Sequence, residues 1–293
     1  ITKAHFKTNG QQRTLPFSEG FSVARSTLIN FLKAHAQSLG ITLCHQKILP
    51  KDLYSLQKKY DLVIASDGIN SIARKKFKQT LQAKAHTAKM KFSWFLNTTQ
   101  EEKTEASFYA LNTKEGVTLF SSYPLTKHQQ VVIIEMSDHC LASGPLKNKS
   151  PTEAIPYLNT LLSKHDTTTQ LIPANLPWYT FKMNTTKTLY YKNLALMGDA
   201  AYSFHYSAGQ GVTTSFSMAY TFVLCLQNNS SIPFALEQYN RSIGMLLSDP
   251  SKKSLRHMNW FENIDRLFNE TNPDEWLDLF LQKDEYSKHT TVE

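Results

Sequence analysis

Two short apolar runs, far apart in the chain, do most to limit how this sequence can fold. Residues 60–65 (YDLVIA) lead into an Asp-Gly pair at 67–68. Residues 194–197 (LALM) lead into a Gly-Asp pair at 198–199. Runs of this kind are typical of strands buried on both faces of a parallel sheet. Because such sheets bind ligands beyond the carboxyl ends of their strands, both pairs are expected at a ligand site.

The segment between the two runs has a different pattern. Strand-like pieces recur from about 87 to 185, with a probable helix near 152–163, and predict an antiparallel sheet. After the second run, a helix is predicted over 211–227, and the chain to about 282 is mostly helical. The sequence therefore predicts one α/β layer in two pieces, with an antiparallel sheet inserted between them.

The N-terminal part of the chain predicts smaller elements. Residues 3–17 alternate around an Asn-Gly turn at 9–10, which is typical of a hairpin. A helix is expected next, with its N-terminal cap at Ser26 or Thr27 and its end at Gly40. A short strand is predicted to follow at 41–44.

Composition excludes several classes of protein. Hydrophobic residues make up 41% of the 293 positions, as in soluble globular proteins, and the longest dense apolar stretch, 219–226, is too short to cross a membrane. The three cysteines form no CxxC pair, so we expect no metal site and a reducing, cytoplasmic location. The net charge of +8 is carried by scattered lysines with no nucleic-acid-binding motif, so nucleic acid is not an expected partner.

The second apolar run leads into the richest candidate site. Gly198 allows tight passage of the backbone off the strand, and Asp199 can accept hydrogen bonds from a polyol. The Gly-Gln-Gly sequence at 209–211 opens a helix whose free amides and positive dipole end favour an anion. An Asp-Gly pair alone is a common turn, but the two sites in this order make a ligand function the favoured interpretation.

Three segments resemble a known family. DLVIASDGINSIAR (61–74) is similar to the second dinucleotide-contact motif of flavoprotein monooxygenases of the p-hydroxybenzoate hydroxylase type. LALMGDAA, followed by GQG, resembles their ribityl-binding motif, and FSVARSTLINFL (21–32) resembles their helix with a flavin-contacting arginine. Together with the intervening sheet, the resemblance covers nearly the whole chain.

The resemblance implies a set of cofactor contacts. Arg25 is expected to touch the flavin, Asp67 to lie near the pyrophosphate, and Asp199 to bind the ribityl chain. The helix from Gly211 is expected to stabilise negative charge on the reduced flavin. The residues so assigned to FAD binding are Arg25, Asp67, Gly68, Gly198, Asp199, Ser207, Gly209, Gln210 and Gly211.

A narrower resemblance bears on the reaction. His205-Tyr206-Ser207 and WFENIDRLF (260–268) resemble the branch containing salicylyl-CoA 5-hydroxylase, aminobenzoyl-CoA monooxygenase/reductases and the tryptophan-derived hydroxylase of the violacein pathway. This implies an aromatic or indolic substrate, including CoA thioesters, with NAD(P)H as reductant and O2 as oxidant. His205 is a hypothetical catalytic residue beside the flavin ring; its alternative is a structural histidine.

The organisation that follows is an incomplete doubly wound FAD-binding domain of residues 1–86 and 186–293, with an inserted substrate-binding sheet domain at 87–185. The GxGxxG turn of the first βαβ unit, typical of complete members, does not occur in this sequence. We therefore expect an N-terminally truncated hydroxylase. Two alternatives stay open: a flavin-dependent reductase, or a non-catalytic remnant whose exposed sheet edge is covered by a partner or a second copy.

Overall fold

The computed structural model describes residues 1, 3–8, 10–16, 22–99, 102–166 and 168–283, and it divides into two compact units. The sheet unit comprises Ile1–His45, Lys89–Thr180 and Phe261–Gln282, and the α/β unit comprises Gln46–Ala88, Phe181–Trp260 and Lys283. The central stretch of the sheet unit is 89–180, and the predicted insert is 87–185. The first 45 residues group with that sheet.

The sheet unit is built on an eight-stranded mixed sheet, of which residues 83–88 in β4 and 181–186 in β9 belong to the α/β unit. Its strands are β1 (Lys3–Thr8), β2 (Gln11–Pro16), β4 (Ala83–Thr98), β5 (Ala106–Thr113), β6 (Gly116–Thr126), β7 (Gln129–Ser137), β8 (Leu171–Pro173) and β9 (Tyr179–Thr186). Their order is β2-β1-β5-β6-β7-β4-β8, and β9 also pairs with β4. The predicted hairpin is confirmed as β1 and β2. It joins the sheet because β1 pairs in parallel with β5, from Ala4↔Ala106 onward.

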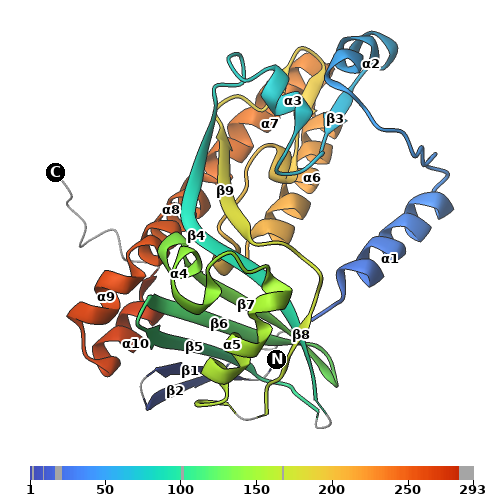
Figure 1. Ribbon diagram of the computed structural model, residues 1–293. Coiled ribbons are helices and arrows are strands. Elements are labelled where there is room, and N and C mark those ends of the chain that lie inside the picture. The colour runs from blue at the N-terminus through green and yellow to red at the C-terminus, as the bar shows by residue number, and fades with distance from the viewer. Residues whose placement is uncertain (2, 9, 17–21, 100–101, 167, 284–293) are drawn as a thin grey trace. The chain divides into compact units, whose positions relative to one another are not determined.

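Helices cover part of this sheet. The helices of the unit are α1 (Arg25–Ser38), α4 (Asp138–Ala142), α5 (Pro151–Leu162), α9 (Ile264–Glu270) and α10 (Pro273–Leu281), with a 3-10 turn, η2 (Gly144–Leu146). The predicted helix near 152–163 is confirmed as α5, which begins with a capping box between Ser150 and Glu153. Its buried Leu158 packs with Phe95 and Phe120 of the sheet, and Figure 1 shows α5 across one sheet face.

The segment around α1 differs from the prediction in two details. The helix begins at Arg25 after Ala24, which makes no side-chain cap, so Ser26 and Thr27 lie inside the helix. Gly40 follows the helix with a φ of +77°, which confirms the glycine stop. The predicted strand at 41–44 is wrong: these residues are irregular and exposed, because no neighbouring strand pairs with their backbone.

The α/β unit contains a small sheet and a set of helices. Its elements are η1 (Pro50–Asp52), α2 (Leu53–Lys59), β3 (Val63–Ala65), α3 (Ile72–Lys76), β10 (Tyr190–Tyr191), β11 (Leu194–Leu196), η3 (Gly198–Ala200), η4 (Tyr206–Ala208), α6 (Gly211–Gln227), α7 (Ile232–Leu246) and most of α8 (Ser248–Glu262). The sheet order is β10-β11-β3, with β3 parallel to β11. The predicted helix 211–227 is confirmed as α6, with the same limits.

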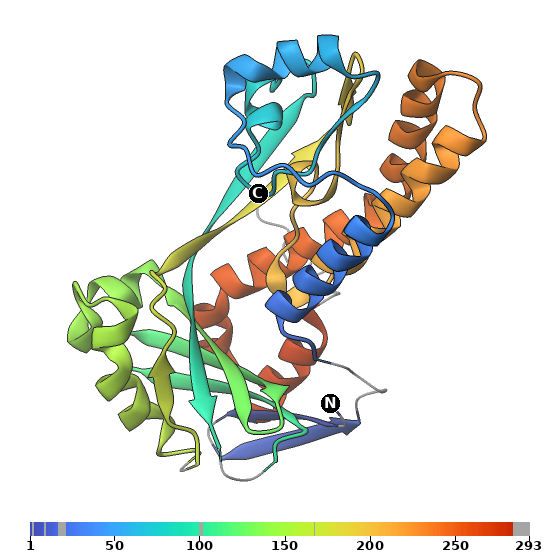
Figure 2. The same cartoon turned by 90° about the vertical axis from the view of Figure 1, so that its right-hand side faces the viewer.

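The core of this unit forms where α6 and α7 pack beside β11. Leu196 of β11 is fully buried, and the Tyr239 hydroxyl of α7 donates to its carbonyl at 3.0 Å. Phe222 of α6 meets Tyr239 edge to face, and Figure 2 shows α6 and α7 as a pair. The predicted burial of 194–197 is therefore confirmed at β11.

The other apolar run is less buried than expected. Ile64 in the middle of β3 is 45% exposed, so the expectation that 60–65 is covered on both faces is wrong at this position. The face of β3 on which Ile64 lies is left uncovered, and β3 is also the outermost strand of its sheet in the described part of the chain. Across the described ranges, no helix is long and apolar enough to cross a membrane.

Candidate functional site

The pairing of β3 with β11 brings the two predicted ligand loops together. Val63 lies opposite Leu194, and Ala65 lies opposite Leu196, in parallel register. Both strands therefore end at the same edge of the sheet. The loops that carry Asp67 and Asp199 leave from that edge, where doubly wound folds bind ligands.

A buried arginine connects the two loops. Arg74 of α3 is 5% exposed, and its Nη1 donates to the carbonyl oxygens of Asp199 (3.1 Å) and Ala200 (2.6 Å). Its Nη2 donates to the carbonyl of Ile69 in the first loop. Burial lowers the pKa of Arg74, and the nearby carboxylates of Asp67 and Asp199 act in the opposite direction. The guanidinium thus supplies a fixed positive charge between the two carboxylates.

Asp67 has a clear local role as well as a candidate one. Its Oδ2 accepts a hydrogen bond from the backbone N–H of Ile72 at 2.7 Å, at the start of α3. The side chain stays exposed at the sheet edge. Gly68 follows with a φ of +77°, and no atom lies within 4 Å of where a Cβ would stand. The backbone there is open to close approach by a ligand.

The second loop passes from β11 to α6 through two more left-handed glycines. Gly198 has a φ of +60°, and an added Cβ would lie 3.0 Å from the Ser215 hydroxyl of α6. The absence of a side chain therefore lets the loop pack closely on the helix. Gly209 has a φ of +63° with open space around it. Gly198 is fixed by packing, whereas Gly209 leaves room for a ligand.

The residues at the start of α6 fit the cofactor that the sequence predicts. Gln210 is the N-cap residue and Gly211 begins the helix, so the first amides of a 17-residue helix point out of its N-terminus. Within the described part of the chain, Oε1 of Gln210 is a buried acceptor without a hydrogen-bond partner. A ligand with hydroxyl or N–H donors and a negative charge, as FAD has, matches this donor and acceptor set.

His205 lies in the loop between the two glycines and is 1% exposed. Its backbone N–H donates to Ser254 Oγ at 2.5 Å, and its Nδ1 lies 2.8 Å from Ser207 Oγ. Burial is the main reason that its pKa is lowered, to about 3, with smaller contributions from His257 and Lys283. At neutral pH this side chain is therefore an uncharged imidazole.

Ser207 joins His205 to a second histidine. Its Oγ lies 2.9 Å from Nδ1 of His257 on α8, which is also buried. Sequence reasoning missed His257 and Ser254, because 50 residues separate them from the loop. A spacing of three residues does place them on one face of a helix, but that pattern is equally typical of core packing.

Two further buried polar residues support the loops. Asn184 Nδ2 donates to the Ile69 carbonyl at 3.1 Å, and the Asn184 backbone N–H donates to Ser203 Oγ at 2.8 Å. Ser203 Oγ donates to the carbonyl of Lys182 at 2.9 Å. These contacts tie both loops to β9. In the sequence these are two ordinary polar residues that no motif marks.

Two sets of predicted residues belong to the sheet unit. Arg25, the first residue of α1, is exposed there, and its contact with the flavin stays a prediction. Among the aromatic residues of β4, Phe95 is fully buried in the core under α5. Phe92 and Trp94 lie on the other face of the strand, with ring centroids 5.0 Å apart, and Trp94 contacts Tyr179 at 5.4 Å.

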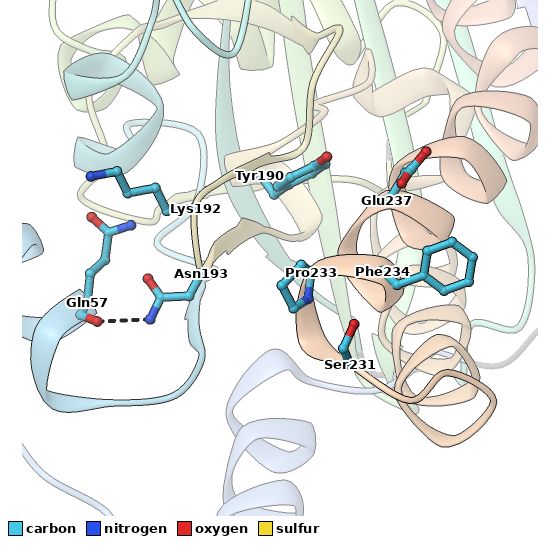
Figure 3. A pocket seen from close by; sticks show the side chains of 8 residues that line it. All are labelled: Gln57, Tyr190, Lys192, Asn193, Ser231, Pro233, Phe234 and Glu237. Atoms are coloured by element: carbon cyan, nitrogen blue, oxygen red, sulfur yellow. Dashed lines mark hydrogen bonds between the residues drawn. The ribbon is translucent and has the colours of Figure 1, made fainter.

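A large open groove lies elsewhere in the α/β unit. Figure 3 shows this groove of about 670 Å³, which is lined by Gln57, Tyr190, Lys192, Asn193, Ser231, Pro233, Phe234 and Glu237. Asn193 Nδ2 donates to the Gln57 carbonyl at 2.9 Å beside it. Because Lys192 and Asn193 precede β11, the groove lies at the opposite end of that strand from Asp199. We therefore place the candidate site at the carboxyl end, despite the size of the groove.

Comparison with known proteins supports a flavoprotein. Residues 52–229 match the family described as FAD binding domain. The chain is 25% identical over 254 residues to salicyloyl-CoA 5-hydroxylase of a Streptomyces species, covering 84% of this chain and 48% of that protein. It is 23% identical over 247 residues to protodeoxyviolaceinate monooxygenase of Chromobacterium violaceum, covering 83% and 65%. The chain therefore spans about half to two thirds of the length of these relatives.

Solved structures share the fold. The tetrameric form of 2-methyl-3-hydroxypyridine-5-carboxylic acid oxygenase superposes with a TM-score of 0.62 at 15% identity, covering 89% of this chain and 72% of that one. A flavin-dependent halogenase, CmlS, superposes with a TM-score of 0.65 at 14% identity, covering 98% and 59%. The chain thus has a mixed α/β fold resembling FAD-dependent hydroxylases, with a large mixed sheet and C-terminal helices.

Proposed function

Because the chain belongs to the FAD binding domain family of flavin-dependent monooxygenases, we propose that it takes part in hydroxylation of an aromatic or indolic substrate, with NAD(P)H as reductant and O2 as oxidant. The observation that carries this proposal is the parallel pairing of β3 with β11. That pairing brings the Asp67 and Asp199 loops to one sheet edge, joined by Arg74.

Each part of this edge has a role toward FAD. The Asp199 carboxylate would accept hydrogen bonds from the ribityl hydroxyls, and Asp67 and Gly68 would hold the pyrophosphate. The amides at the start of α6, near Gly209 and Gly211, stabilise negative charge on the ring. Bound FAD supplies the electron transfer and oxygen activation; the protein positions it and keeps the site polar where charge develops.

His205 is proposed to act at the ring end of this site. Its burial and lowered pKa keep the imidazole neutral, so it can donate or accept one hydrogen bond toward the substrate without carrying charge. The left-handed Gly209 that follows lets the loop turn into α6. A neutral imidazole is suited to orienting a polar group on an aromatic ring.

The substrate is proposed to contact the aromatic residues of the sheet unit. Phe92, Trp94 and Tyr179 form one cluster on the face of β4 opposite the α5-covered core. Phe92 is 6% exposed and supports the partly exposed rings of Trp94 and Tyr179, which provide an apolar surface for a flat substrate. The two sequence relatives carry the names of a hydroxylase of salicyloyl-CoA and a monooxygenase of protodeoxyviolaceinate, which supports a ring-bearing substrate.

The reaction is tested with purified protein, FAD, NADH or NADPH, and a panel of aromatic thioesters and indoles under 18O2. The proposal predicts substrate-stimulated NAD(P)H oxidation and a product with one 18O atom. NAD(P)H oxidation with no labelled product for any substrate would instead support the reductase alternative.

A second candidate function rests on exposed apolar residues. On α6, Val212, Phe216 and Tyr220 recur every fourth residue and are 60%, 52% and 68% exposed. In the same unit, β3 is an edge strand of its sheet, and its residue Ile64 is also exposed. Large exposed apolar surfaces of this kind mark interaction sites. The second candidate function is therefore that of a non-catalytic protein whose partner covers this surface. Purified protein that takes up no FAD would support this candidate.

A further inference from the structure

Two buried histidines share a single hydroxyl group beside the proposed ring end of the site. Ser207 Oγ lies 2.8 Å from Nδ1 of His205 and 2.9 Å from Nδ1 of His257. The histidines are 1% and 2% exposed. The three side chains form a continuous hydrogen-bonded chain that joins the loop before α6 to α8.

Hydrogen-bond counting restricts the protons in this chain. A serine hydroxyl carries one proton, so it can donate to only one of the two Nδ1 atoms. The other Nδ1 must carry its own proton and donate to Ser207 Oγ. In the neutral chain, one histidine is therefore protonated at Nδ1 and the other at Nε2. The tautomer of His205 and the tautomer of His257 are opposite.

We propose that Ser207 and His257 are positioning residues that set the tautomer of His205 and let one proton pass between the outer nitrogens of the two histidines. This inference rests on the proposed function for its biological use, but its geometry does not depend on a bound flavin. It assigns a role to His257, which lies outside the motifs that indicate the cofactor site.

The proton transfer balances without any other reactant. A proton that arrives at Nε2 of His205 releases the proton on its Nδ1 to Ser207 Oγ. The hydroxyl proton of Ser207 moves to Nδ1 of His257, and Nε2 of His257 releases its proton to a neighbouring acceptor or water. One proton enters and one leaves, and both histidines end as the other neutral tautomer.

Helix α8 holds this chain in place through two side chains on one face. Ser254 Oγ accepts from the backbone N–H of His205, and His257 follows one turn later. The ring of His205 packs at 5.0 Å from Phe181 and 4.8 Å from Tyr206, which limits its rotation.

The surroundings favour a neutral His205. His257 and Lys283 are the titratable groups that lower the pKa of His205 in addition to burial. Both disfavour a positive charge on His205. A chain of neutral groups can reverse its direction at little electrostatic cost, whereas a buried imidazolium has a large desolvation penalty.

The direct test is 15N NMR of histidine-labelled protein without added flavin, with each signal assigned by loss in His205→Asn and His257→Asn. Protonated and unprotonated ring nitrogens give well-separated 15N shifts. The proposal predicts opposite neutral tautomers for His205 and His257 near pH 7. Ser207→Ala is expected to abolish the coupling between the tautomers of His205 and His257. Ser207→Thr, which keeps a hydroxyl, is expected to retain this coupling. Equal tautomers in wild type, or no change in Ser207→Ala, would overturn the proposal.

A second measurement separates positioning from mere packing. In flavin-loaded protein, Ser207→Ala is expected to lower coupled product formation about tenfold or more and to alter its pH profile, and Ser207→Thr to restore both. Unchanged profiles in Ser207→Ala would contradict a role in the reaction. If the protein takes up no flavin, the proposed function fails while the NMR result still decides the tautomer coupling.

Discussion

At the scale of single residues, the geometry of the candidate site depends on Arg74. Its guanidinium donates to three backbone carbonyls from two loops, one of them five residues before Arg74 in the chain and the other 125 and 126 residues after it. The hydrogen bond to Ala200 is buried and the other two are partly buried, so these carbonyls need this donor. Arg74 is therefore a structural residue that holds Asp67 and Asp199 at a common edge.

Replacing Arg74 tests this role. Arg74→Met removes the donors and leaves buried carbonyls without hydrogen bonds, so we expect the free energy of unfolding to fall by about 3 kcal/mol. Urea denaturation followed by circular dichroism measures the loss. Arg241→Met, at an exposed arginine on α7, is the matched control and should change stability little. Equal stability of Arg74→Met and the control would contradict the assignment.

His205 gives a prediction about pH. Its pKa is about 3 in the folded protein and near 6.5 when unfolded, so between these values only the unfolded chain binds the proton. The contribution of His205 to the free energy of unfolding is therefore at its maximum above about pH 6.5. It decreases as the pH falls, by about 2 kcal/mol at pH 5. His205→Asn should show a smaller decrease from pH 7 to 5 than wild type and than the exposed-site control His86→Asn. Parallel pH curves for all three proteins would count against a buried neutral His205.

Sequence reasoning identified one group of site residues and missed another. Asp67 and Asp199 were predictable because each follows an apolar strand directly, so local pattern indicates their place. Arg74, Ser254 and His257 act through contacts across 49 or more residues. No local periodicity in the sequence indicates such contacts. Only the folded chain brings these residues to the loops.

At the scale of elements, α6 was predictable to its last residue and β3 was not. Glycines before α6 and an apolar repeat along it define its limits in local sequence. The burial of β3 depends on what covers its faces in the folded chain, which its own residues do not encode. The strand expected at 41–44 failed because no strand among the described residues pairs with it.

The junction between β11 and α6 gives a prediction at this scale. Gly198→Ala places a side chain at φ +60°, which costs about 1–2 kcal/mol, and brings its Cβ to 3.0 Å from Ser215 Oγ. Gly209→Ala has the same backbone cost without the contact, so it should be less destabilising. In a Ser215→Ala background the cost of Gly198→Ala should decrease. Thermal unfolding of the five variants, with Gly209→Ala also made in the Ser215→Ala background, checks this order; equal costs at the two glycines in both backgrounds would contradict close packing of the loop on α6.

At the scale of the whole molecule, the sequence predicted a sheet inserted into an α/β layer, and the structure divides into a sheet unit and an α/β unit, each made of separate stretches of the chain. It did not predict that the first hairpin joins the large sheet. That pairing links Ala4 to Ala106, and parallel neighbours so far apart leave no signal in either segment. The mixed sheet follows from this one long-range contact.

The central claim is that this chain binds a flavin at the sheet edge where β3 and β11 end. Family membership and the geometry of the candidate site both support this claim. FAD titration, followed by flavin absorbance and fluorescence, tests it most directly in wild type, Asp199→Ala and the exposed control Asp249→Ala. We predict saturable FAD binding in wild type and the control, and a Kd about tenfold or more higher in Asp199→Ala, because one charged hydrogen bond is lost. Protein that takes up no FAD, or equal affinity in all three, would contradict the claim.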